Sequence, residues 1–182
     1  MMTKWLKSLL WPLKQIDAAL PRQGLIIDLG CGDGTVAAYL ARESRRQVIG
    51  LDIHPPRRPG LLNLVFKPQN ILQADLKSAS GCLLSDCLHH LLPGEQQLLL
   101  ERLSRQLKTG SACVIKEIDR HDFIRSKLSR LWDWLLYPQD AIRYYSSQEL
   151  IRIMTKLKFT VVHSRPSPWF PGSVNLFVCT KL

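Results

Sequence analysis

Short apolar runs alternate along this chain with segments whose apolar residues follow helical spacing. A continuous apolar run that ends in glycine, proline or a polar turn is typical of a strand buried on both faces of a sheet. Apolar residues three and four positions apart are typical of an amphipathic helix. These patterns predict strands at 24–30, 47–53, 70–76, 82–88, 111–119, 160–165 and 175–182, and helices at 4–20, 35–46, 94–110, 121–137 and 146–159.

The alternation of strands with helices predicts an α/β fold. Strands joined through helices pair in parallel by right-handed crossovers, so the sheet is doubly wound, with helices on both faces. A length of 182 residues fits a single domain over 1–182. Pro12 is expected to kink or split the first helix, and the proline-rich segment 54–60 excludes a regular helix directly after the second strand.

Composition places the chain among ordinary globular proteins. Hydrophobic residues make up 46% and charged residues 22% of the sequence, and no uninterrupted apolar run reaches the ~18 residues that a membrane span requires. The first twenty residues lack an apolar block followed by a small-residue cleavage site, so we expect a cytoplasmic protein. None of the five cysteines forms a Cys-x-x-Cys pair, which predicts reduced thiols and neither a metal site nor disulfides.

The chain carries a formal net charge of +10, with 25 Lys and Arg against 15 Asp and Glu. Such a charge attracts nucleic acid, anionic lipid or an acidic metabolite, and it does not choose among them. The basic residues are spread over several amphipathic segments, which favours a solvated surface. Lysines between the apolar residues of 4–20 leave peripheral contact with an anionic membrane open, as the alternative to packing of this helix on the domain.

The most informative segment joins the first predicted strand to the helix after it. Asp28 ends the apolar run, and three alternating glycines follow it, Gly30, Gly32 and Gly34. Glycines at the carboxyl end of a strand allow backbone N–H groups to approach a ligand closely. A dinucleotide-binding turn needs glycine where Thr35 stands, and the Asp28 carboxylate repels a diphosphate. The turn therefore favours a ligand with a positive charge or with hydroxyl and ammonium donors.

Residues 28–34 resemble motif I of the class I S-adenosylmethionine-dependent methyltransferases, whose usual form is acid-x-Gly-x-Gly-x-Gly. The resemblance extends over nearly the whole chain. It implies a Rossmann-like doubly wound sheet of about seven mostly parallel strands with an antiparallel last strand, S-adenosylmethionine as cofactor, and methyl transfer as the activity. A weaker likeness of 116–119 and the residues after them to small bacterial methyltransferases of unassigned acceptor implies a helical segment at 120–145, inserted over the acceptor site.

The resemblance also implies cofactor-binding residues at the strand ends. In the family an acid that ends the second strand binds both ribose hydroxyls, and Asp52 stands there, 24 residues after Asp28. An acid of the third strand receives the adenine amino group, which implies Asp75 with Leu76 beside the ring. The family has a helix where this chain has the short segment 54–69, which leaves open whether the enzyme is fully active. The implied cofactor-binding set is Asp28, Gly30, Cys31, Gly32, Asp52, Ile53, Asp75, Leu76 and Asp86.

Candidate residues for the methyl acceptor follow the fourth and fifth predicted strands. The sulfonium methyl is already activated, so alignment of the acceptor is the main task and a base is optional. For an oxygen acceptor, His89 or His90 suits proton transfer near neutrality, unless the rings pack beside the following helix instead. The remaining candidates for an acceptor pocket are Glu117, Asp119, Tyr144 and Tyr145, with surface contacts as their alternative role.

Methyl transfer to a small-molecule or lipid-like acceptor, at oxygen, is the function that these residues favour. An RNA methyltransferase is the first alternative, but the chain shows neither an RNA-binding module nor an Asn/Asp-Pro-Pro-Tyr motif at the fourth strand. A non-catalytic subunit that keeps the fold and binds the cofactor or a partner is the second. The sequence leaves the oligomeric state open.

We predict that the protein binds S-adenosylmethionine and S-adenosylhomocysteine but not NAD, because its glycine turn carries an acid and lacks the third dinucleotide glycine. Titration calorimetry with the full chain measures the three affinities. Tighter binding of NAD than of S-adenosylhomocysteine would contradict the cofactor assignment.

Overall fold

The computed structural model describes residues 12–43, 45–57, 61–119, 143–167 and 174–182, and the structural statements below concern these residues. The strands are β1 (Gly24–Leu29), β2 (Arg46–Asp52), β3 (Leu64–Pro68), β4 (Gly81–Ser85), β5 (Ala112–Glu117), β6 (Phe159–Ser167) and β7 (Val174–Lys181). The α-helices are α2 (Leu13–Ala19), α3 (Thr35–Leu40), α4 (Pro93–Gln106) and α6 (Ser147–Lys156), and the short 3-10 helices are η1 (Ile71–Gln73) and η2 (Leu88–His90).

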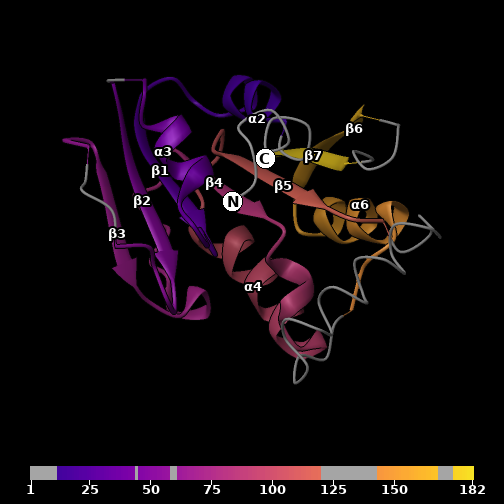
Figure 1. Ribbon diagram of the computed structural model, residues 1–182. Helices are drawn as coiled ribbons and strands as arrows, with labels where there is room; N and C mark the ends of the chain where they lie inside the picture. The colour runs from indigo at the N-terminus through magenta and orange to yellow at the C-terminus, as the bar shows by residue number, and fades with distance from the viewer. Residues whose placement is uncertain (1–11, 44, 58–60, 120–142, 168–173) are drawn as a thin grey trace.

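Strand β1 lies inside a seven-stranded sheet with the order β3-β2-β1-β4-β5-β7-β6 (Figure 1). β2 and β4 pair in parallel with β1 on either side, and β3 and β5 continue the parallel pairing outward. β7 runs antiparallel between β5 and β6. The chain thus winds away from β1 in both directions, and a sheet of this kind binds ligands at the carboxyl ends of its central strands. The predicted doubly wound, mostly parallel α/β fold with an antiparallel last strand is confirmed.

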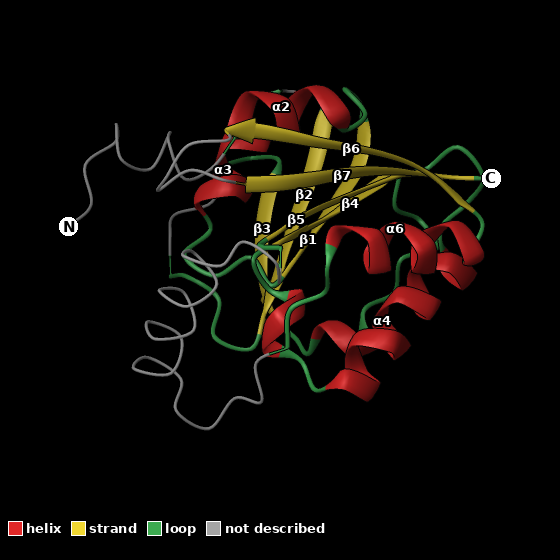
Figure 2. Cartoon of the chain, turned by 90° about the vertical axis from the view of Figure 1, so that its right-hand side faces the viewer, coloured by secondary structure: helices red, strands yellow, loops and turns green. Residues whose placement is uncertain are grey.

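Helices cover both faces of the sheet (Figure 2). α2 and α3 pack on one face, where Ile16 of α2 joins a core that includes Ile26 of β1. α4 and α6 pack on the other face, where Leu99 and Met154 join the larger core. Because successive side chains of a strand point to opposite faces, Asp28 lies on the same face as Ile26, toward α2 and α3.

The prediction of the third strand at 70–76 is wrong. β3 covers Leu64–Pro68 instead, and part of 70–76 forms η1. β3 pairs only with β2 at the edge of the sheet, so Leu64 is its one buried residue, and its apolar run is only three residues long and ends at Lys67 and Pro68. The Asn70 side chain accepts a hydrogen bond from the backbone N–H of Leu72, which begins a 3-10 turn where a strand is predicted.

Two predicted helices begin or end elsewhere. α3 ends at Leu40, and Arg46, the last residue of the predicted helix, belongs to β2. In the described part of the first helix, α2 begins directly after Pro12, because the fixed φ of proline suits a helix start better than its interior. Three predicted segments lie wholly or partly outside the described residues: 4–11 of that helix, the helix at 121–137, and 120–142 of the inserted segment predicted at 120–145.

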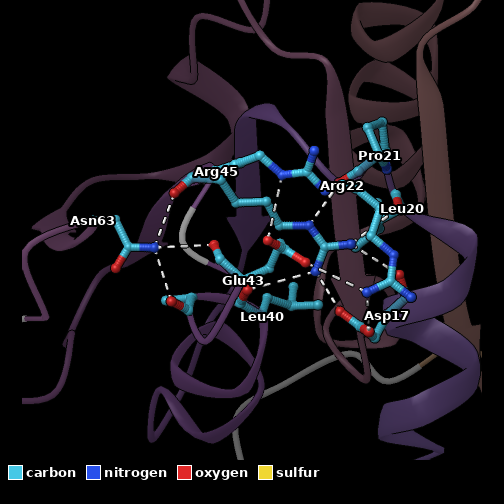
Figure 3. A network of polar contacts seen from close by, with 10 residues as sticks. Asp17, Leu20, Pro21, Arg22, Leu40, Glu43, Arg45 and Asn63 are labelled. Atoms are coloured by element: carbon cyan, nitrogen blue, oxygen red, sulfur yellow. Dashed lines mark hydrogen bonds and ion pairs between the residues drawn. The ribbon is translucent and has the colours of Figure 1, made fainter.

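The guanidinium group of Arg46, at the start of β2, is fully buried. It pairs with the Asp17 carboxylate and donates to the carbonyl oxygens of Asp17 (2.9 Å), Leu20 (3.0 Å) and Pro21 (2.6 Å) around the end of α2 (Figure 3). A longer bond of 3.5 Å reaches the Leu40 carbonyl at the end of α3. The last carbonyls of a helix lack partners within it. One side chain therefore satisfies the ends of two helices and ties both to β2.

The described residues hold no helix long and apolar enough to cross a membrane. All five cysteines are unbridged and buried, and the His, Cys, Asp and Glu side chains of the described segments form no group suited to a metal ion. Cys82, Cys113 and Cys179 lie at paired positions of β4, β5 and β7, inside the core beneath α4 and α6. There the thiols pack as small apolar groups.

We expect Arg46→Met to lower the free energy of unfolding by about 3–5 kcal/mol, because it leaves a carboxylate and several helix-end carbonyls without their buried donor. Chemical denaturation measures the loss. Arg45→Met is the matched control, since the Arg45 side chain is 66% exposed and surface changes stay within about 0.5 kcal/mol. Equal losses in the two variants would show that the buried network does not hold the helix ends.

Candidate functional site

The turn after β1 is built from three glycines in the left-handed region, with φ of 74° at Gly30, 51° at Gly32 and 72° at Gly34. The N–H groups of Gly30 and Cys31 both donate to the Leu51 carbonyl of β2, at 2.8 and 3.0 Å. A Cβ at Gly30 or Gly34 would lie 2.6 Å or less from a neighbouring side chain, whereas a Cβ at Gly32 would meet nothing within 4 Å. The lack of a side chain at Gly30 and Gly34 therefore allows neighbouring side chains to pack against the turn, while Gly32 faces open space.

The side chain of Asp52, the last residue of β2, is hydrogen-bonded to this turn. One carboxylate oxygen accepts from the Gly32 N–H at 2.9 Å, and the other accepts from the His54 N–H at 2.9 Å. Each carboxylate oxygen can accept more than one hydrogen bond, so Asp52 supports the turn and keeps capacity for a ligand's hydroxyls. Ile53 follows with 66% of its surface exposed, an apolar face beside the same open space.

Asp28 is the most unusual group of the site. Its carboxyl is 1% exposed, and neither oxygen has a hydrogen-bond partner. Burial and then the charge of Asp52 raise its pKa from 3.8 to about 7, and the nearby Ala37 amide opposes this shift without completing a hydrogen bond. A buried carboxyl without a partner is costly, so the fold keeps an acid here that its own contacts do not require.

The end of β3 brings Gln69 beside Asp52, and the predicted Asp75 lies further along the chain. The Gln69 N–H donates to the Asp52 carbonyl at 2.8 Å, which places 69–70 beside Asp52. Asp75 lies further along, exposed, and accepts from the Lys77 N–H at 3.1 Å. Leu76 is buried in the core beneath α4. The sequence prediction missed Gln69 and Asn70 because it placed the third strand at 70–76, beyond the end of β3 at Pro68.

Beyond β4, Asp86 adopts a positive φ of 54°, which is uncommon outside glycine. Its carboxylate forms an ion pair with Lys116 of β5, and its N–H donates to the Lys116 carbonyl at 2.9 Å. Lys116 is 5% exposed. The strained backbone is thus held by two contacts with one residue, and the Asp86 carboxylate is shared with a cation.

His89 and Glu117 meet between η2 and the end of β5. The Nδ1 atom of His89 lies 2.6 Å from one Glu117 oxygen, and the Leu88 N–H donates to the other at 2.9 Å. The Tyr144 ring stacks on the His89 ring with centroids 4.8 Å apart, and the His90 ring lies 4.3 Å away. The fold therefore places three of the predicted site residues, His89, Glu117 and Tyr144, in one buried cluster.

The other two predicted acceptor residues, Asp119 and Tyr145, line the same small cavity as His89 and Glu117, and each also lines a larger hollow. Asp119 accepts from the N–H and hydroxyl of Ser147 and lies 4.0 Å from Arg165. It lines a hollow of about 420 Å³ between the start of α6 and β6, and Tyr145 lines one of about 360 Å³ between α4 and α6. Glu117 and His89 border a cavity of about 10 Å³, which has room for about one water molecule.

A methyltransferase-domain family matches residues 5–164 of the chain. A search of curated proteins finds no significant match.

Solved structures of low sequence identity share the fold. The 1,6-didemethyltoxoflavin-N1-methyltransferase of Burkholderia thailandensis, bound to 1,6-didemethyltoxoflavin and S-adenosylhomocysteine, has a TM-score of 0.76 at 20% identity, over 96% of this chain and 78% of its own. Human N-acetylserotonin methyltransferase, in complex with S-adenosylmethionine, has a TM-score of 0.72 at 17% sequence identity. The match covers 93% of this chain and 51% of the human chain. A methyltransferase of Methanosarcina mazei has a TM-score of 0.68 at 18% sequence identity, and the match covers 95% of this chain and 98% of that protein. The chain thus spans about half of the human enzyme.

The raised pKa of Asp28 makes stability depend on pH. The folded protein holds the Asp28 proton more tightly than the unfolded chain, so stability falls as pH rises from about 4 through 7, by about 4 kcal/mol for the full shift. We expect Asp28→Asn to be more stable than the wild type at pH 8 and equal to it near pH 4, in denaturation at both pH values. Asp75→Asn, at an exposed acid, is the control. A gain that does not vary with pH would contradict the assignment.

Proposed function

The chain belongs to the methyltransferase-domain family and is a class I S-adenosylmethionine-dependent methyltransferase, and from this premise we propose that it methylates a small-molecule acceptor at oxygen. Two observations support the cofactor part of the proposal: Gly32 of the glycine turn faces free space and donates its N–H to Asp52, and the buried Asp28 of β1 has no hydrogen-bond partner. The proposal divides the carboxyl edge of the sheet into a cofactor side at β1, β2 and β3 and an acceptor side at β4 and β5.

The residues of the cofactor side fit the chemistry of S-adenosylmethionine. Asp28 offers a buried negative charge to the ammonium group, because an opposite charge relieves the cost of a partnerless carboxylate. Asp52 has oxygens for the ribose hydroxyls, and the exposed Ile53 suits one face of the adenine. We assign the adenine edge to Gln69 and Asn70 in place of Asp75, since these two lie beside Asp52.

Two further members of the implied cofactor set have narrower roles. Cys31 is a small spacer within the turn: burial raises the pKa of its thiol to about 12, so it stays protonated and is no nucleophile. Asp86 shares its carboxylate with Lys116, so it meets the cofactor as one half of an ion pair.

On the acceptor side, the chain's task is to orient an acceptor and to remove a proton. S-adenosylmethionine supplies a methyl group that its sulfonium already activates, so catalysis rests largely on alignment. We propose His89 as the base, because imidazole is the side chain best suited to accept a proton close to neutral pH. His90, whose ring lies 4.3 Å from that of His89, is the second candidate.

The acceptor class is supported by pocket size and by the fold's relatives. The hollow of about 420 Å³ beside Asp119 lies in the range of sites for small molecules. The structural relatives from Burkholderia and from man are named for 1,6-didemethyltoxoflavin and N-acetylserotonin, which are small molecules. Asp119 and Tyr145 are the acceptor-lining residues of the proposal.

The experiment that tests the function is mass spectrometry of metabolite extracts incubated with the full chain and isotope-labelled S-adenosylmethionine. A labelled small molecule is the expected product. Binding of S-adenosylhomocysteine without any labelled product would favour the alternative of a non-catalytic subunit, and label in RNA would favour the nucleic-acid alternative.

We expect Gly32→Val to abolish binding of S-adenosylhomocysteine, because the new side chain fills the open space over Asp52. Calorimetry measures the affinity. Gly110→Val is the matched control, since Gly110 also has a positive φ, of 83°, and a Cβ there also meets nothing within 4 Å, but it lies in the turn before β5. Both variants carry the same backbone strain. Retained affinity in Gly32→Val, or equal loss in both, would mean that the turn does not touch the cofactor.

A further inference from the structure

We propose that Arg102 of α4 is a positioning residue for the adenine of the cofactor, because it holds the segment after β3 where the Asn70 amide can recognise the adenine edge. The inference rests on the proposed function, which assigns the adenine edge to Gln69 and Asn70. It adds a residue from a distant element and makes the site selective for adenine over a purine that lacks the amino group.

The segment that joins β3 to β4 has little regular structure of its own. Its one helical element, η1, is three residues long. The hydrogen bonds of η1 are local: the Gln73 N–H donates to the Asn70 carbonyl at 2.9 Å, and the Ala74 N–H donates to the Ile71 carbonyl at 3.2 Å. A single helical turn is not stable by itself, so the position of Asn70 depends on contacts from other elements.

Two side chains of α4 supply such contacts. The Nη2 group of Arg102 donates to the Ala74 carbonyl at 2.9 Å, and Oε1 of Gln106 accepts from the Leu76 N–H at 2.8 Å. Residues four positions apart lie on the same face of a helix, so both bonds come from one face of α4. Ala74 and Leu76 are also buried in the same core as Leu103 of this helix.

The two arginines of α4 have different surroundings. The Nε atom of Arg102 is buried and has no hydrogen-bond partner in the described part of the chain, and a buried donor without an acceptor is destabilising. The Arg105 side chain is 65% exposed and pairs with Glu101 at 3.5 Å, one turn earlier on the same helix. The bond to Ala74 therefore offsets the partial burial of Arg102, and Arg105 provides a matched control without such a bond.

Arg102 fixes the far end of η1, and Asp52 fixes the near end. The Gln69 N–H donates to the Asp52 carbonyl at 2.8 Å, which anchors the start of the segment beside the cofactor side of the site. The bond from Arg102 anchors Ala74, directly after η1. With both ends held, Asn70 has one position relative to Asp52. Loss of the bond to Ala74 would leave η1 anchored through hydrogen bonds at its start and at Leu76 only.

The Asn70 amide is suited to adenine in particular. Its side chain is exposed, and its Oδ1 atom accepts from the Leu72 N–H at 2.9 Å, which fixes the oxygen and nitrogen ends of the amide. The oxygen can accept a second hydrogen bond, and the nitrogen donates two. Adenine presents an amino donor beside a ring-nitrogen acceptor, a pair that an Asn side chain matches. Hypoxanthine has a carbonyl oxygen in place of the amino group and would bring a second acceptor to Oδ1.

The first arm of the test needs no cofactor. Amide hydrogen exchange of residues 69–77 is measured in the full chain, in Arg102→Met and in Arg105→Met. We expect exchange in this segment to be faster by about 10-fold in Arg102→Met, because local opening no longer breaks a bond to α4, and to be unchanged in Arg105→Met. Unchanged exchange in Arg102→Met would overturn the proposal. Faster exchange spread evenly over the whole sheet would also overturn it, because it would show a loss of global stability.

The second arm measures the affinities for S-adenosylhomocysteine and S-inosylhomocysteine by calorimetry. We expect the wild type and Arg105→Met to bind S-adenosylhomocysteine about 10-fold more tightly or better, because the amino group meets Oδ1 of Asn70. Arg102→Met is expected to lose most of this preference, with weaker binding of S-adenosylhomocysteine and nearly unchanged binding of S-inosylhomocysteine. Arg102→Lys is expected to restore part of the preference, since its ammonium group can donate to the Ala74 carbonyl.

The outcomes separate positioning from a merely structural role. Equal weakening of both ligands in Arg102→Met would show a structural role alone and would overturn the proposal. Equal binding of both ligands by the wild type would refute the assignment of the adenine edge, and this proposal with it. Absence of a methylated product from the wild type would refute the proposed acceptor chemistry alone, because neither arm requires turnover.

Discussion

The carbonyl oxygen of Leu51 accepts two hydrogen bonds, from Gly30 and Cys31, and the site depends on this pairing of the β1 turn with the end of β2. These two bonds extend the hydrogen bonding between the parallel strands β1 and β2 past Leu29, the last residue of β1. Asp52 is thereby brought beneath Gly32, whose N–H it accepts. Without glycine at position 30, a side chain would collide with Cys87 beyond β4 and open the turn. A backbone register, rather than any single side chain, thus creates the cofactor side of the site.

The carboxyl edge gathers acids in a chain whose net charge is strongly positive. Each acid is satisfied differently: Asp52 by backbone N–H groups, Asp86 by Lys116, Glu117 by His89, and Asp119 by Ser147. Asp28 alone among them has no hydrogen-bond partner. Burial disfavours its charge, so the fold gives up stability at neutral pH to keep an acid that a cationic ligand can complete. In the proposed function, the burial that lowers stability at neutral pH also prepares Asp28 for the cofactor's ammonium group.

The amino ends of the strands serve a different purpose. At the start of β2, Arg46 joins the ends of α2 and α3 through a buried set of carbonyl contacts and one ion pair. None of the cofactor-side residues takes part in it. Stability is thus concentrated at one edge of the sheet and chemistry at the other. This separation allows the carboxyl edge to hold strained residues such as Asp86, with its positive φ.

The sequence by itself determined the α/β class, the helices α4 and α6, and the glycine turn with Asp28 and Asp52, because these depend on local spacing and on strands with a continuous apolar run. It did not determine β3, whose apolar run is only three residues long, nor the nearness of Gln69 to Asp52. Only the tertiary structure decided that Glu117 meets His89, that Lys116 meets Asp86, and that Arg46 meets the end of α2. Those contacts join residues 26 to 30 positions apart, and strand order and register, which arise from the packing of the whole sheet, decide which of them face one another.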